Sequence, residues 1–147
     1  MGSSVTIKCK ECNYTKSFIT GAGMMYSTQR LMDFESEFAL LPDVIQSKKT
    51  VSKIKELLSE HGAVIADNYG HRIYHCTKCG EFHERFFIHL DYDDGSFEVD
   101  YKCPKCKANL SPINKWEEKA INLKKYPCPK CGKHGLYEDF EDYVLWD

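Results

Sequence analysis

The sequence of 147 residues predicts an α+β fold in which small antiparallel sheets carry a two-helix insertion. Three patterns lead to this prediction. Eight cysteines fall into four evenly spaced pairs, apolar residues alternate between the second and third pairs, and apolar residues recur every three or four positions after the first pair. Hydrophobic residues make up only 42% of the chain, so metal cross-links would add usefully to a modest core.

Every cysteine belongs to a Cys-x-x-Cys pair, which we call a knuckle. The four knuckles are Cys9/Cys12, Cys76/Cys79, Cys103/Cys106 and Cys128/Cys131. Two intervening residues let the chain turn tightly enough for both thiolates to bind one Zn²⁺ at about 2.3 Å. Because closed sites of four cysteines are structural, we expect two structural Zn²⁺ ions, each held by four cysteines.

The residue types alone leave two other uses of these cysteines open, namely a redox dithiol and an iron site. A thioredoxin-like dithiol usually occurs once and in a βαβ context, which this sequence lacks. Iron in a rubredoxin-like site would use the same four ligands as zinc. The first ten residues contain no apolar signal segment, and no apolar run is long enough to span a membrane. We therefore expect a cytoplasmic, reducing compartment, in which cysteines bind metal rather than form disulfides.

The residue after each second cysteine should adopt a positive φ if the knuckle is tight. The four occupants are Asn13, Gly80, Lys107 and Gly132. Glycine and asparagine tolerate the left-handed region, so we expect it at three of these positions, with Lys107 as the exception.

The segment between the first two knuckles is predicted to begin with a strand over Tyr14–Thr20 and then to become helical. One helix should run from a cap at Ser27 to about Leu41, and a second from about Ser47 to His61. Residues 63–75 are predicted to form a hairpin with its turn at Asp67–Gly70. Farther on, Ser111–Pro112 is expected to start a short helical stretch around Trp116, Ala120 and Ile121, while the tail Leu136–Asp147 fits a strand or a helix equally well.

The segment between the second and third knuckles is predicted to form another hairpin. Phe82, Phe86, Ile88 and Leu90 share one parity, Asp91–Ser96 forms a turn, and a return strand follows through Tyr101. This order of knuckle, hairpin and knuckle over Cys76–Cys106 resembles the zinc-ribbon superfamily. The whole chain resembles small uncharacterised bacterial zinc-ribbon proteins with four Cys-x-x-Cys knuckles. These resemblances imply small antiparallel zinc-ribbon sheets and a metal, but no activity.

Two pairings of the knuckles are open. In the nested pairing, which the hairpin favours, Cys76/Cys79 share an ion with Cys103/Cys106, and Cys9/Cys12 share one with Cys128/Cys131. In the sequential pairing, the first knuckle joins the second and the third joins the fourth. The nested pairing gives a single compact unit over 1–147. It contains a mainly helical insertion at 13–62, a central zinc ribbon at 71–110, and second zinc-ribbon half-sites at 1–20 and 123–147.

Charge and motifs favour a non-catalytic adaptor that binds protein partners. The formal net charge is −2, and two filled Cys₄ sites would bring it to about −6. Nucleic acid is thus a disfavoured partner, although His83, Arg85, Phe87 and His89 on the central ribbon could contact it. No nucleophile–base constellation is present, so no catalytic residue is assigned. The ribbon also resembles that of transcript-cleavage elongation factors. This resemblance implies an alternative function as a transcript-cleavage-type accessory factor, in which an acidic pair at the hairpin tip, here Asp93 and Asp94, would help a polymerase to hold a catalytic metal. The sequence does not indicate an oligomeric state.

Overall fold

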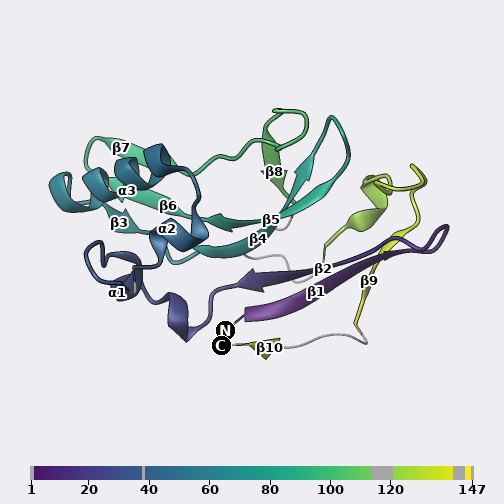
Figure 1. The fold of residues 1–147 in the computed structure, drawn as a ribbon, viewed down its shortest axis with the longest axis horizontal. Helices are drawn as coiled ribbons and strands as arrows, with labels where there is room; N and C mark the ends of the chain where they lie inside the picture. The colour runs from purple at the N-terminus through teal and green to yellow at the C-terminus, as the bar shows by residue number, and fades with distance from the viewer. Residues whose placement is uncertain (1, 38, 114–120, 141–144, 147) are drawn as a thin grey trace.

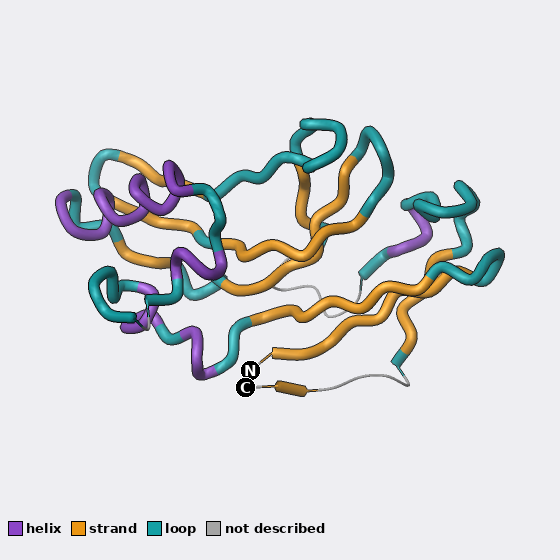
Figure 2. Tube along the Cα trace, in the orientation of Figure 1, coloured by secondary structure: helices purple, strands orange, loops and turns teal. Residues whose placement is uncertain are grey.

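The computed structural model describes residues 2–37, 39–113, 121–140 and 145–146. The described chain is rich in strands, has few helices, and pairs its strands antiparallel, which is consistent with the predicted α+β class (Figures 1 and 2). Helices α1–α3 gather at one end of the elongated molecule, and the loops that carry the knuckles lie toward the other (Figure 1). None of the described helices is both long and apolar enough to cross a membrane.

The first ribbon, which we call the outer ribbon, joins the two ends of the chain. Strands β1 (Gly2–Cys9) and β2 (Thr15–Gly21) form a hairpin, with the first knuckle at its turn. Strand β9 (Leu136–Asp139) follows the fourth knuckle and pairs with β1, so that Cys9 lies opposite Leu136. Strand β10 (Leu145–Trp146) pairs with the start of β1. The tail, which the sequence left undecided, therefore contributes strands where it is described.

The second ribbon, which we call the inner ribbon, has the same plan. Strands β4 (Gly70–Cys76) and β5 (Phe82–Phe87) form a hairpin, with the second knuckle at its turn. Strand β8 (Leu110–Pro112) follows the third knuckle and pairs with β4, so that Cys76 lies opposite Leu110. The chain thus contains the same three-stranded unit twice, with the inner ribbon inserted between the halves of the outer one.

The two ribbons meet through β2. One backbone pairing, Gly21 with His71, joins β2 to β4 and completes a seven-stranded sheet. Side chains link the ribbons beyond that point: Ile19 N–H donates to Glu84 Oε1 at 2.6 Å, and Tyr14 Oη donates to Glu81 Oε1 at 3.2 Å. Burial, then the neighbouring Glu81 carboxylate, raises the pKa of Tyr14, so its hydroxyl remains a donor at neutral pH.

The helical segment differs from the prediction in its first half. Instead of one helix over 27–41, a 3₁₀ turn (Met24–Tyr26) leads into the single-turn helix α1 (Thr28–Leu31), and α2 spans Leu41–Val44. The side chain of Asp33 accounts for the break. Its Oδ1 accepts the backbone N–H groups of Glu35 at 3.2 Å and Ser36 at 3.1 Å, which offers the backbone an alternative to the helix.

The second predicted helix forms as α3 (Lys48–Glu60). Ser47 caps it by accepting the N–H of Thr50 at 3.3 Å, and Gly62 follows its end with φ +63°. Its apolar face packs with a second, three-stranded sheet of β3 (Val64–Ile65), β6 (His89–Tyr92) and β7 (Gly95–Glu98).

Both predicted hairpins after residue 62 need correction. Strand β3 pairs with β6 rather than with β4, so residues 63–75 are not a hairpin. The predicted strand through Phe82 and Leu90 is divided at Ile88: β5 pairs back to β4, whereas β6 pairs with β7 in the other sheet. The expected turn at Asp93–Asp94 does form, but between β6 and β7. Pro112 lies in β8, and the helix expected around Trp116 falls outside the described residues.

Candidate metal centres

The structure brings the eight cysteines together as two groups of four, in the nested pairing. Within each group, the Sγ atoms all lie within 4.8 Å of one another. The outer cluster consists of Cys9, Cys12, Cys128 and Cys131. The inner cluster consists of Cys76, Cys79, Cys103 and Cys106. The sequential pairing is therefore wrong.

The sulfur–sulfur distances fit a metal rather than a disulfide. In the outer cluster, Sγ···Sγ is 3.8 Å for Cys9/Cys131 and 3.6 Å for Cys12/Cys128. In the inner cluster, three such distances are 3.7–3.8 Å. A tetrahedral ion with about 2.3 Å bonds to sulfur has edges of about 3.8 Å, whereas a disulfide requires about 2.05 Å. Each cluster therefore has the size of a Zn(Cys)₄ tetrahedron.

The backbone of the knuckles repeats one hydrogen-bond pattern. In each, the N–H of the first cysteine donates to the carbonyl oxygen five residues later, at 2.8–3.1 Å. Backbone N–H groups also donate to sulfur. The N–H of Glu11 donates to Cys9 Sγ and that of Lys130 to Cys128 Sγ, both over 3.4 Å, and the N–H of Cys79 donates to Cys76 Sγ over 3.5 Å. Such donors stabilise thiolates and orient them toward an ion.

The left-handed positions differ from the prediction at two knuckles. Gly80, Lys107 and Gly132 have φ of 78°, 62° and 77°, whereas Asn13 does not have a positive φ. At the three left-handed residues, the N–H donates back to the carbonyl of the first cysteine at 2.8–2.9 Å, which fixes the turn regardless of residue type. In the first knuckle, Tyr14 N–H instead donates to Cys12 Sγ at 3.4 Å.

In each cluster, one cysteine has a lowered pKa and another has a raised pKa. In the inner cluster, the Cys106 backbone N–H lowers the pKa of Cys103 to about 6. The neighbouring Cys79 thiol, burial and the other cysteines raise the pKa of Cys106 to about 12. In the outer cluster, burial raises the pKa of Cys9, but the backbone N–H groups of Glu11 and Cys12 outweigh burial and lower this pKa to about 7. The backbone N–H of Tyr14 lowers the pKa of Cys12, but burial and the neighbouring cysteines together raise it to about 12. A bound divalent ion would supply the positive charge that lets all four thiolates form. The donor set thus fits a soft divalent metal such as Zn²⁺.

Residues around the clusters hold the knuckles close. At the outer cluster, a Cβ on Gly135 would lie 3.2 Å from Cys9 Sγ, so glycine permits the approach of the C-terminal segment. Lys10 N–H donates to the Gly135 carbonyl at 2.9 Å. At the inner cluster, His83 Nε2 lies 3.8 Å from Cys103 Sγ and adds a side-chain contact that the sequence did not assign.

The other residues singled out from the sequence do not converge on one site. Phe87 is buried, and the guanidinium carbon of Arg72 lies 3.8 Å from its ring centroid, so this ring is covered rather than free to stack on a base. His89 bridges Asp91 and Glu98 on the β6–β7 hairpin. Asp93 and Asp94 are exposed in the turn of that hairpin, which is not the hairpin that carries a knuckle.

A repeat in the sequence indicates that the outer and inner ribbons share one plan. Cys-Pro-Lys-Cys occurs at 103–106 and again at 128–131, and each copy leads to a buried leucine, Leu110 or Leu136. Each leucine lies opposite the first cysteine of the partner knuckle. This signal extends beyond the cysteines themselves and identifies the third and fourth knuckles as equivalent halves of two ribbons.

Comparison with known proteins assigns no family. No protein-family model matches the chain, and neither the curated proteins nor the solved structures yield a significant match. The class is therefore defined by the site alone, as a protein with two Cys₄ clusters in a zinc-ribbon-like arrangement.

Proposed function

We propose that this chain is a structural zinc-binding protein that serves as a non-catalytic adaptor for protein partners. The observation that carries the proposal is the pair of Cys₄ clusters with edges of 3.6–3.8 Å. Four thiolates complete the coordination of Zn²⁺ and leave no open position for water or substrate. Metal in such sites stabilises the fold rather than carrying out a reaction, so function would reside in the surfaces that the ribbons present.

Two features support a protein as the partner. The chain has a formal net charge of −2 before any site is filled, which is unfavourable for broad contact with phosphates. Several large apolar side chains are also exposed among the described residues, including Met24, Met25, Met32 and Phe140. Exposed apolar groups of this kind suit protein contacts.

The metal half of the proposal is tested by elemental mass spectrometry and thiol titration on the native protein. We expect two zinc ions per chain and no thiols that react before the metal is removed. One ion, iron in place of zinc, or four reactive thiols in the native protein would contradict two closed zinc sites.

The adaptor half is tested by affinity capture from native extract with the zinc-loaded chain as bait. We expect a defined protein partner that is lost when the bait is treated with a chelator. A bait that retains both zinc ions yet captures nothing specific would overturn the adaptor role and leave the metal assignment intact.

A further inference from the structure

The residue five positions after the first cysteine closes each of the first two knuckles. In the outer ribbon, the N–H of Cys9 donates to the carbonyl oxygen of Tyr14 at 3.1 Å, and in the inner ribbon the N–H of Cys76 donates to that of Glu81 at 3.0 Å. Tyr14 also donates its own backbone N–H to Cys12 Sγ at 3.4 Å. Because both ribbons follow one plan, Tyr14 and Glu81 occupy equivalent positions, and each belongs to the turn that holds its cluster.

The side chains of these two residues join the ribbons directly. Tyr14 Oη donates to Glu81 Oε1 at 3.2 Å. Lys16 adds two contacts from the outer ribbon, since its Nζ donates to the carbonyl oxygen of Phe82 at 2.6 Å and lies 3.5 Å from Glu81 Oε1. The side chains of Lys16 and Glu81 are 39% and 25% exposed, so water screens this network only in part. A short chain of hydrogen bonds therefore leads from the first knuckle to the second through Tyr14 and Glu81.

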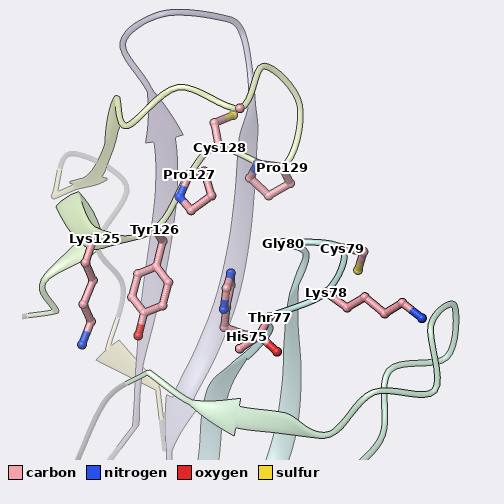
Figure 3. Close-up of a pocket in the computed structure, with 11 residues that line it drawn as sticks. His75, Thr77, Lys78, Cys79, Gly80, Lys125, Tyr126, Pro127, Cys128 and Pro129 are labelled. Atoms are coloured by element: carbon pink, nitrogen blue, oxygen red, sulfur yellow. The ribbon is translucent and has the colours of Figure 1, made fainter.

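The two clusters also share their surroundings. One apolar cluster contains Cys9 of the outer ribbon together with Phe82 of the inner ribbon, and Tyr14 packs against it. The second and fourth knuckles line a common cleft, in which the loop of Cys79 faces that of Cys128 (Figure 3). Because the turns around the two clusters are packed together, order in one knuckle favours order in the other.

Metal binding supplies the change that this contact transmits. A Cys₄ knuckle without its ion loses the order that the ion imposes, because the binding free energy of a structural Zn²⁺ is largely folding free energy. An ordered outer knuckle holds the Tyr14 hydroxyl where Glu81 accepts it, and Glu81 is then already placed to close the inner knuckle. The reverse holds when the inner site fills first, since the coupling free energy between two binding sites is reciprocal.

We propose that the two zinc sites bind metal with positive cooperativity, coupled through the hydrogen bond from Tyr14 to Glu81. This inference rests on the proposed zinc-binding function and adds that each ion raises the affinity for the other. The coupling concerns affinity rather than capacity. Either site still fills alone, because structural Zn²⁺ binds so tightly that an affinity reduced by about fivefold to tenfold still gives full occupancy when one equivalent of zinc is supplied.

Electrostatic repulsion between the filled clusters opposes this coupling. Each Zn(Cys)₄ centre carries a charge of about −2. Lys78 and Lys125 line the cleft that the second and fourth knuckles share, and both reduce the repulsion. Salt at physiological ionic strength also screens exposed charges separated by more than about 8 Å. Because Tyr14→Phe changes no charge at neutral pH, this variant isolates the contribution of the hydrogen bond.

The coupling is measured by zinc competition between the full chain and a chelator at physiological ionic strength. The coupling factor is the two-ion binding constant divided by the product of the binding constants of each site alone. These single-site constants come from Cys106→Ser, which leaves the outer site, and from Cys131→Ser, which leaves the inner site. We expect a factor of about five or more with Tyr14, and a factor of about one or less when Tyr14→Phe is introduced into all three chains.

Tyr101→Phe is the matched control for Tyr14→Phe. Tyr101 Oη donates to the carbonyl oxygen of Phe86, so this variant also loses a hydroxyl hydrogen bond, but one that joins two parts of residues 71–110. It should leave the coupling factor unchanged. Glu81→Met removes the acceptor of the Tyr14 hydrogen bond. Tyr14→Phe combined with Glu81→Met should therefore lose no more coupling than Glu81→Met alone.

Native mass spectrometry of half-loaded protein gives a second measurement that needs no cysteine substitution. One zinc ion is supplied per chain, and the fraction of chains that carry a single ion is determined. We expect this fraction to be higher for Tyr14→Phe than for the unmodified chain, because cooperativity favours empty and fully loaded chains over chains with one ion.

Four results would overturn the inference: a coupling factor of one or less in the unmodified chain, a factor that Tyr14→Phe leaves unchanged, an equal decrease with Tyr101→Phe, or equal single-ion fractions at half loading. The proposed zinc-binding function fails by a different result, which is fewer than two zinc ions per chain at saturation. Two ions bound without coupling would retain that function and remove only the connection between the sites.

Discussion

Lys107 is an exposed residue held in the left-handed region, with φ +62°. A side chain at this φ costs about 1 kcal/mol relative to glycine, which occupies the equivalent positions at Gly80 and Gly132. Lys107→Gly should therefore raise the free energy of unfolding of the zinc-loaded protein by about 1 kcal/mol. Chemical denaturation measures it. Lys105→Gly, in the same knuckle but without a positive φ, is the control and should be neutral or destabilising.

His89 lies between two carboxylates, with Asp91 Oδ1 2.9 Å from Nε2 and Glu98 Oε2 3.1 Å from Nδ1. Burial lowers its pKa, but the hydrogen bonds and charges of these carboxylates outweigh burial, so the pKa is raised above 6.5. Since the folded value exceeds the unfolded one, the resulting stabilisation is complete below about pH 6.5 and is lost as pH rises through the folded pKa.

This pH dependence can be measured by NMR titration of the His89 ring. Glu98→Gln should bring the pKa down toward 6.5, whereas Asp93→Asn, in the turn of the same hairpin, should change it little. A pKa at or below 6.5 in the unmodified chain would contradict the bridging geometry.

At the scale of elements, the contact between β2 and β4 depends on Gly70. A Cβ at this position would lie 2.8 Å from both the carbonyl carbon and the oxygen of Gly21, and φ is +147°. Because backbone cannot move aside as a flexible side chain does, Gly70→Ala should destabilise the protein by about 2–3 kcal/mol.

Gly62→Ala provides a matched control for this substitution. Gly62 also has a positive φ, of +63°, but a Cβ there meets nothing within 4 Å. Its replacement should cost about 1 kcal/mol from backbone strain alone. Equal losses for the two variants in thermal or chemical denaturation would show that the β2–β4 approach contributes nothing.

The elements differ in how far the sequence determines them. The knuckles and α3 depend on local signals, namely cysteine spacing and the cap at Ser47, and sequence reasoning anticipates both. The division of the strand at Ile88 does not depend on a local signal, because β5 and β6 continue one alternating pattern. Long-range packing determines that β5 pairs with β4 and that β6 pairs with β7. Likewise, the apolar period after Ser27 matches a helix, but the side chain of Asp33 competes locally for backbone N–H groups.

At the scale of the whole molecule, the two clusters should be separable by substitution. Cys131→Ser should leave one zinc per chain and expose β1 and β9 amides to hydrogen exchange, while β4 and β8 stay protected. Cys106→Ser should do the reverse, so each variant controls for the other. Elemental analysis and exchange mass spectrometry report both outcomes. Loss of both ions from either variant would show that the ribbons do not bind metal independently.

The nesting of one ribbon inside the other imposes an order on biosynthesis. The ligands of the inner cluster, from Cys76 to Cys106, emerge from the ribosome before Cys128 does, so this ribbon can fold and acquire its ion first. The outer cluster must wait for Cys128 and Cys131, and it closes a much longer stretch of chain. Until then, the β1–β2 hairpin lacks its β9 partner strand and carries two unpaired thiols, which makes the nascent chain vulnerable to oxidation over that interval.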